Sequence, residues 1–213
     1  MKIKVLKECG YEEALLGLGL SYGLTDDEVS IGGVLSDRLI RVSKNLCERD
    51  YGHNKFLESI QVWLDVTAPR YWHSEADTYR VGSTKQSQST MHTLMKKPFT
   101  QEMFEQKIPD SVLMELEQLR KDNSFEELKN LLPEGFLQRR IWNVNYKVLR
   151  NILIQRHNHK LNLWKDFCLF IFRNVEHGEF FRDIMLTQGS SGFTYAIGNG
   201  VFGDSGVTGG QKL

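Results

Sequence analysis

Hydrophobic side chains recur along the chain with two periods, which predict its secondary structure. Ile3 and Val5 alternate with lysines, the pattern of a half-buried strand. A second strand is predicted over 59–66, which is rich in β-branched residues. Helical spacing of apolar residues predicts helices over 11–20, 35–49, 142–156 and 161–172, with two more beginning near Pro109 and Ser124. This order of elements predicts a single α+β or α/β domain.

Two local features refine the predicted helices. Ser124 and Glu127 have the spacing of a capping box, in which each side chain bonds the other's backbone N–H. In a helix from Trp142 to Arg156, Asn145 and Arg156 would lie within roughly 20° of each other, since each residue turns the helix by about 100°. That face would then carry a polar group at each end.

The segment from Arg70 to His92 is unusually polar and has no aliphatic residue between Gly82 and Thr90. We predict a loop that lines a polar site, because such a segment offers little to a packed core. Alternating His73, Glu75 and Asp77 would share one face of a strand, where they could ligate a metal, but a solvated strand face explains the pattern equally well.

A second metal-binding alternative rests on histidines near the C-terminal end of the chain. His157 and His159, with the distant His177, could contribute ligands. Two histidines at positions i and i+2 of a helix diverge, however, so a polar helix–helix junction is the simpler interpretation. We therefore predict no metal centre.

Composition narrows the possible functions. The chain has 27 basic and 27 acidic residues, so its zero net charge predicts no general nucleic-acid binding. Three cysteines without a C-x-x-C spacing indicate reduced thiols. The densest apolar run, 161–172, carries charges, and no signal peptide is evident, so we expect a cytoplasmic protein without a membrane anchor. Eight glycines in 189–213 predict a tail separate from a domain over 1–188.

Two blocks of the sequence together resemble the flavin-dependent thymidylate synthase family. The family's C-terminal pattern is matched by Leu132-Pro133, Trp142-x-Val144-Asn145, Asn151 and Arg156, and its strand and P-R-F step by Phe56-Leu57-Glu58 and Ala68-Pro69-Arg70-Tyr71. The resemblance covers roughly residues 50 to 175. It implies a single α+β domain with a mixed or antiparallel sheet and long helices.

The resemblance also implies an activity and a set of site residues. Family members are homotetramers that bind FAD at subunit junctions and move a carbon from methylenetetrahydrofolate to C5 of dUMP. Arg156 would contact the pyrimidine as the catalytic residue and favour its ionised form. The remaining matched positions imply FAD contacts by Arg80, Asn145 and Asn151, and substrate contacts by Glu75, Gln86 and Lys129.

The family's signature loop is heavily altered in this chain. Its fixed letters fall on Thr78, Tyr79, Arg80, Ser83, Lys85, Gln88 and Thr90, of which Arg80 and Ser83 agree. Thr78 and Tyr79 replace an Arg-His pair that faces FAD. Glu75 and Gln86 exchange the family's usual Gln and Glu, which suggests a changed base, since a carboxylate can accept from the amine of cytosine. The alternative is a non-catalytic homologue that serves as an oligomeric interaction protein.

Overall fold

The computed structural model describes residues 1–24, 30–31, 34–49 and 52–186. Its main strands are β1 (Lys2–Cys9), β4 (Gln61–Pro69), β5 (Ser83–Ser87) and β6 (Leu137–Asn145), and a small hairpin is formed by β2 (Ser30–Ile31) and β3 (Val34–Leu35). The helices are α1 (Tyr11–Leu20), α3 (Asp37–Cys47), α4 (Arg70–Ala76), α5 (Thr90–Thr93), α6 (Asp110–Lys121), α7 (Phe125–Leu131), α8 (Tyr146–Arg156), α9 (Asn162–Asn174) and α10 (Arg182–Leu186). Short 3-10 turns are η1 (Lys55–Glu58), η2 (Gln101–Met103) and η3 (Gly178–Phe181).

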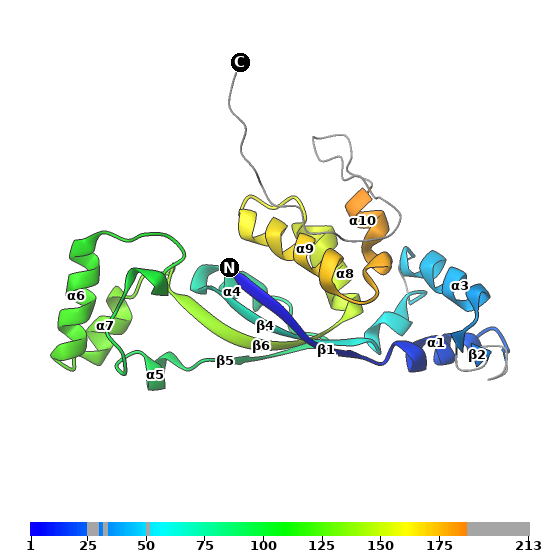
Figure 1. Ribbon diagram of the computed structural model, residues 1–213, viewed down its shortest axis with the longest axis horizontal. Coiled ribbons are helices and arrows are strands. Elements are labelled where there is room, and N and C mark those ends of the chain that lie inside the picture. The colour runs from blue at the N-terminus through cyan, green and yellow to red at the C-terminus, as the bar shows by residue number, and fades with distance from the viewer. Residues whose placement is uncertain (25–29, 32–33, 50–51, 187–213) are drawn as a thin grey trace, which may run out of the picture.

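The main sheet is antiparallel and has the strand order β1-β4-β6-β5. Along β4, Val62, Leu64 and Val66 are buried while the residues between them are half-buried, as expected when one face of a sheet meets the core. Helices α4, α8 and α9 lie on one side of this sheet (Figure 1). The α+β class and the antiparallel sheet are therefore as predicted.

A cluster of aromatic rings joins the sheet to these helices. Trp72 of α4 lies 4.5 Å from Trp164 and 5.3 Å from Phe167 of α9, measured between ring centroids. Trp142 of β6 stacks on Phe167 at 5.7 Å. Aromatic pairs at these separations add to the stabilisation from burial alone, so the cluster fixes α4 and α9 against β6.

A second, smaller core lies in the segment between β5 and β6. It consists of Leu94, Phe99, Phe104, Leu116, Leu128 and Leu132. Helices α6 and α7 carry part of it and form the end of the molecule farthest from α1 and α3 (Figure 1). This segment therefore packs around its own apolar side chains rather than on the helices that cover the sheet.

The predicted helix over 142–156 is wrong at its start. Trp142 to Asn145 end strand β6, where Val144 pairs with Val62 and Asn145 with Gln61 of β4. The helix begins at Tyr146, and the Asn145 side chain caps it by accepting the Val148 N–H at 2.9 Å. Asn145 and Arg156 therefore do not share a helical face.

The predicted loop over 70–92 is also wrong. Residues 70–76 form α4 because Trp72 and Ala76, four positions apart, bury one face of a helical turn. Strand β5 is an edge strand whose polar side chains remain largely in water, so it needs no aliphatic residue. The predicted capping box is absent, since the Ser124 side chain makes no capping bond to α7.

Several other predictions are confirmed or shifted by a few residues. Strand β1 and helix α1 match the predicted segments, whereas β4 runs over 61–69 rather than 59–66. The glycine-rich tail from Gly189 lies outside the described residues. In the described part of the chain, no helix is long and apolar enough to cross a membrane.

Candidate active site

Arg156, the last residue of α8, is the centre of a cluster of polar and aromatic side chains. Its Nε donates to the Tyr79 hydroxyl at 3.0 Å and its Nη1 donates to Glu75 Oε2 at 2.9 Å. The guanidinium also lies over the Trp164 ring, 5.0 Å from its centroid, in a cation–π arrangement. Helix α4, the turn after it and helix α9 thus all contribute to holding one charged group.

Glu75 receives two donors on the same carboxylate oxygen. Besides Arg156, the indole Nε1 of Trp164 donates to Oε2 at 2.8 Å. The side chains of Arg156 and Glu75 are 19% and 34% exposed, so the pair is partly screened by water and both charges can still reach a ligand. The sequence-predicted contact residues Glu75 and Arg156 are therefore brought together.

His159 lies beside this pair. Its Nε2 accepts an Arg156 Nη1–H at 2.9 Å and lies 3.6 Å from Glu75 Oε2. His159 therefore contacts both members of the Arg156–Glu75 pair.

The turn between α4 and β5 is held by a second group of charges. Asp77 accepts two bonds from Arg140 Nη1, at 2.8 and 2.9 Å, and lies 3.9 Å from Lys85 Nζ. Lys85 also lies over the Trp142 ring at 4.8 Å, and burial lowers the pKa of its ammonium group. Lys85 therefore anchors the turn.

Glycine is required at one position of this turn. Gly82 has φ +71°, and a Cβ there would lie 2.5 Å from Asn145 Nδ2 and 3.0 Å from Val148 Cγ2. The Gly82 carbonyl also accepts the Asn145 N–H at 3.1 Å. The turn is thereby pressed against the first residues of α8.

The three residues for which the resemblance implies FAD contacts have different surroundings. Asn145 is buried and its side-chain oxygen caps α8. Arg80, at the tip of the turn, and Asn151, on α8, are both exposed. Neither of the latter two donates to a side chain in the described part of the chain, so both are available to a ligand.

The other two implied substrate residues lie apart from Arg156 within this chain. Lys129 of α7 donates to Thr90 Oγ1 at 2.8 Å, at the α6–α7 end of the molecule (Figure 1). Gln86 follows Lys85, which lies against the buried Trp142, so Gln86 points to the opposite face of the sheet and is exposed. A single chain thus does not place Gln86 across a pocket from Glu75.

The first metal alternative assumed a strand over His73, Glu75 and Asp77, which the structure does not form. His73, Glu75 and Asp77 lie on or directly after a helix, where alternate residues diverge, and His73 is buried with Nε2 2.9 Å from the Gln138 carbonyl. Within the described residues, no group of three or more His, Cys, Asp or Glu side chains is arranged to hold a metal ion.

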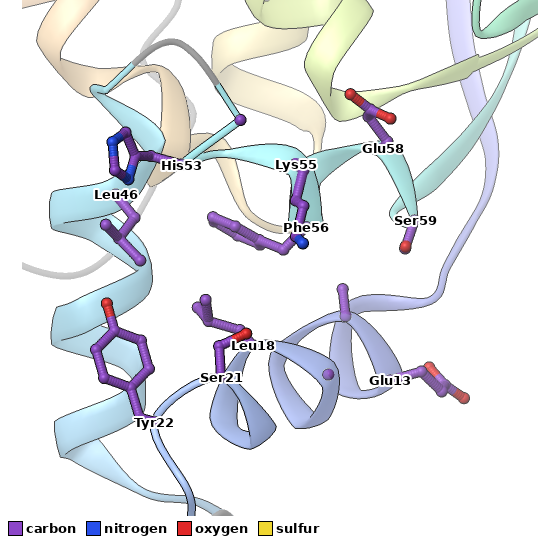
Figure 2. A pocket seen from close by; sticks show the side chains of 13 residues that line it. Glu13, Leu18, Ser21, Tyr22, Leu46, His53, Lys55, Phe56, Glu58 and Ser59 are labelled. Carbon is purple, nitrogen blue, oxygen red and sulfur yellow. The ribbon is translucent and has the colours of Figure 1, made fainter.

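A cavity of about 620 Å³ lies between α1, α3 and η1. Lys55 Nζ points into it and the Tyr22 ring borders it, whereas the Glu13 carboxylate points away (Figure 2). No residue of the Arg156 cluster lines this cavity. Sequence analysis missed it because its lining comes from three separated segments, each ordinary by itself.

Solved structures share this fold. Two structures of the flavin-dependent thymidylate synthase ThyX from Helicobacter pylori, with FAD and dUMP, match with TM-scores of 0.70 and 0.72 at 18% and 17% identity. They cover 86% and 87% of this chain and 99% and 100% of theirs. The UMP/dUMP methylase PolB from Streptomyces cacaoi, bound with 5-Br dUMP, has a TM-score of 0.58 and 11% identity, covering 80% of this chain and 88% of its own.

The similarity to these solved structures defines the fold class of the chain. The chain has the fold of flavin-dependent thymidylate synthases, at an identity that marks wide divergence. No protein-family model and no curated protein matches the sequence. Function therefore has to be argued from the site rather than from the fold alone.

Proposed function

We propose that this protein is a divergent flavin-dependent enzyme that transfers a methyl or hydroxymethyl group to C5 of a pyrimidine deoxynucleotide, dUMP or a relative of it. Methylenetetrahydrofolate is the proposed carbon donor. The observation that carries the proposal is the near-complete overlap with solved enzymes that hold FAD and dUMP. The clustered Arg156, Glu75 and Trp164 give that fold a site suited to a planar, polarisable ring.

In this proposal Arg156 is the catalytic residue. Its guanidinium favours the ionised form of the pyrimidine, whose electron-rich C5 then attacks the carbon donor. The stabilisation is effective because the group is already oriented by protein contacts before the substrate arrives. Trp164 restricts water at one face of the guanidinium and so strengthens this interaction.

The residues present fit FAD as a cofactor. Arg80 and Asn151 are exposed donors, and Lys55 points into the cavity beside η1, where a diphosphate could bind. Bound flavin, once reduced by an external electron donor, would supply the two electrons that convert the transferred carbon into a methyl group. Asn145 contributes by holding the start of α8, which fixes Asn151 and Arg156 in register.

We further propose that a homo-oligomer, a homotetramer by family resemblance, completes the site. Lys129 lies at the α6–α7 end of the molecule, and Gln86 lies on the face of the sheet opposite Lys85. Neither is placed to act with Arg156 of the same copy. A second copy could bring the Lys129 ammonium to the nucleotide phosphate, as a point charge in place of the family's bidentate arginine.

The test measures flavin, oligomer and chemistry separately. Purified protein is titrated with FAD while its visible absorbance is followed, and its mass is determined by gel filtration. Release of tritium from C5 of labelled dUMP is then measured with methylenetetrahydrofolate and a reductant of the flavin present. Arg156→Lys should lower the release about 100-fold with FAD content unchanged. Arg139→Lys is the control, since Arg139 pairs with Asp65 on an exposed surface.

Each outcome has a meaning. Full activity of Arg156→Lys would remove the catalytic role of Arg156. A protein that stays colourless with excess FAD would contradict the enzyme proposal and favour the non-catalytic interaction protein. That alternative has a specific basis, because Thr78 and Tyr79 stand where the family has an Arg-His pair.

The preferred base is tested by calorimetry. If Glu75 accepts from the cytosine amine, dCMP should bind more tightly than dUMP, and Glu75→Gln should reverse the order. Equal or weaker binding of dCMP by the unaltered protein would rule out the changed base while leaving the reaction class intact.

A further inference from the structure

Tyr79 bonds Arg156 through its hydroxyl group. The hydroxyl oxygen accepts the Arg156 Nε–H at 3.0 Å, and its own proton is donated to Gln155 Oε1 at 2.8 Å. A phenol has one proton to donate, so the bond to Gln155 turns the oxygen lone pairs toward Arg156. The direction of the Arg156 contact is thereby fixed.

The backbone of Tyr79 is held as firmly as its hydroxyl. Its carbonyl accepts both Ser83 Oγ, at 2.5 Å, and Lys85 Nζ, at 2.7 Å. Its N–H donates to the Ala76 carbonyl at the end of α4. The turn therefore holds Tyr79 from both sides, and the ring is presented to Arg156 at a set place.

Tyr79 and Glu75 accept hydrogen bonds from two different nitrogens of the Arg156 guanidinium. Tyr79 takes Nε and Glu75 takes Nη1, while Nη2 has no hydrogen bond to any residue that the structure describes. A planar group held at two of its three nitrogens cannot rotate, so its third nitrogen points in one direction. That remaining nitrogen is the one available to a ligand.

We propose that Tyr79 is a positioning residue that orients Arg156 toward the pyrimidine. This inference rests on the proposed function, which it deepens. The resemblance places Tyr79 at a histidine that faces the flavin, whereas in this chain the side chain is bonded to the residue assigned to the substrate. The altered signature loop has thus gained a contact with the catalytic arginine.

The experiment compares Tyr79→Phe with the matched variant Tyr71→Phe. Both remove one phenolic hydroxyl and keep the ring, but Tyr71 has no hydrogen bond through its hydroxyl to a described residue. Exchange of the Arg156 Nε–H with water is measured by NMR on arginine-labelled protein, with the signal assigned from its loss in Arg156→Lys. Tritium release from C5 of dUMP is then measured on the FAD-loaded protein.

We expect Nε–H exchange at least about tenfold faster in Tyr79→Phe than in the unaltered protein or Tyr71→Phe. We also expect kcat to fall about tenfold while KM changes less than about threefold, because the lost orientation matters most where charge develops. A general loss of structure would instead change the thermal melting curve.

Unchanged exchange in Tyr79→Phe would overturn the inference, as would faster exchange with unchanged kcat. If the unaltered protein releases no tritium, the proposed function fails, and the exchange rate alone then decides whether Tyr79 holds Arg156. The two failures are therefore distinguishable.

Discussion

The Tyr146 hydroxyl donates to Glu8 Oε2 at 2.5 Å and so joins the first strand of the chain to the start of α8. The same hydroxyl accepts the His177 N–H at 3.2 Å, and Glu8 Oε1 accepts the Glu176 N–H at 2.9 Å. Burial raises the pKa of Glu8, and the bond from Tyr146 opposes that rise. Three distant segments are thus connected through one carboxylate.

Tyr146→Phe should destabilise the fold by about 1–3 kcal/mol, because it removes the bond to Glu8 Oε2 and the acceptor of the His177 N–H. Urea unfolding followed by tryptophan fluorescence measures the change. Tyr71→Phe is the matched control and should lie within about 0.5 kcal/mol of the unaltered protein. Equal losses of stability in the two variants would show that the bond between Tyr146 and Glu8 does not stabilise the fold.

His73 should make the fold sensitive to mild acid. Burial lowers its pKa from 6.5 to about 4, opposed by its bond with the Gln138 carbonyl, while Arg140 lowers it, Asp77 raises it and Lys85 lowers it. Between these two values the unfolded chain binds more protons than the folded one. The free energy of unfolding should therefore be highest above pH 6.5 and fall by up to about 3 kcal/mol toward pH 4.

Unfolding titrations at a series of pH values check this prediction. The slope between pH 6.5 and 4 should be reduced in His73→Gln, which has no group titrating there. His92→Gln, at an exposed position, is the control and should keep the slope. A His73→Gln slope as steep as that of the unaltered protein would contradict the assignment.

Gly82→Ala should lower the stability of the fold by more than the strain of its positive φ angle alone would. Both Gly82 and Gly23 have positive φ, +71° and +66°, but only a Cβ at Gly82 would meet other atoms within 4 Å. Gly23→Ala should therefore cost about 1 kcal/mol for backbone strain. Gly82→Ala should cost more and also weaken FAD binding, because it pushes the turn away from Asn145.

Thermal melting and FAD titration of both variants measure these effects. If Gly82→Ala is no less stable than Gly23→Ala, the close packing of the turn on α8 is not required by the fold.

Two arginine–aspartate pairs should differ sharply in their contribution to stability. Arg150 is 4% exposed and donates to Asp183 and to the Phe180 carbonyl, whereas the Arg139 side chain is 61% exposed in its pair with Asp65. Arg150→Met should cost about 3–5 kcal/mol because it removes the buried partner of the Asp183 carboxylate and a donor to the Phe180 carbonyl. Arg139→Met should cost at most about 1 kcal/mol.

Chemical denaturation of the two methionine variants gives both values under one set of conditions. Similar losses for both would mean that burial does not decide the contribution of these pairs. The comparison is well matched, since each arginine bonds both oxygens of its aspartate.

The sequence pattern predicted correctly those helices and strands that are determined by residues close together in the sequence. Strand β1 and helix α1 follow from apolar periodicity, because alternation and helical spacing each bury one face whatever the partner. The matched residues Asn145, Asn151 and Arg156 also pointed to the family fold that the solved structures share. These conclusions needed no knowledge of long-range pairing.

The remaining elements, and the contacts of Arg156, were decided by pairing between segments far apart in the sequence. Residues 142–145 are compatible with a helix by themselves and become a strand because β4 supplies hydrogen-bond partners on one side and β5 on the other. The polar segment 70–92 gains its helix and edge strand in the same way. Likewise, Tyr79 and Glu75 reach Arg156 only after α4 packs beside α8 and α9.

The sequence by itself therefore determined the composition of the site, and the tertiary structure determined which of its members meet. Residue types and spacings are local, so they revealed an arginine, a glutamate and a run of polar side chains. Contact between residues 75, 79 and 156 depends on how the turn at Gly82 and the tryptophan cluster bring the helices together on one face of the sheet. That arrangement is a property of the whole packed core, which no short segment encodes.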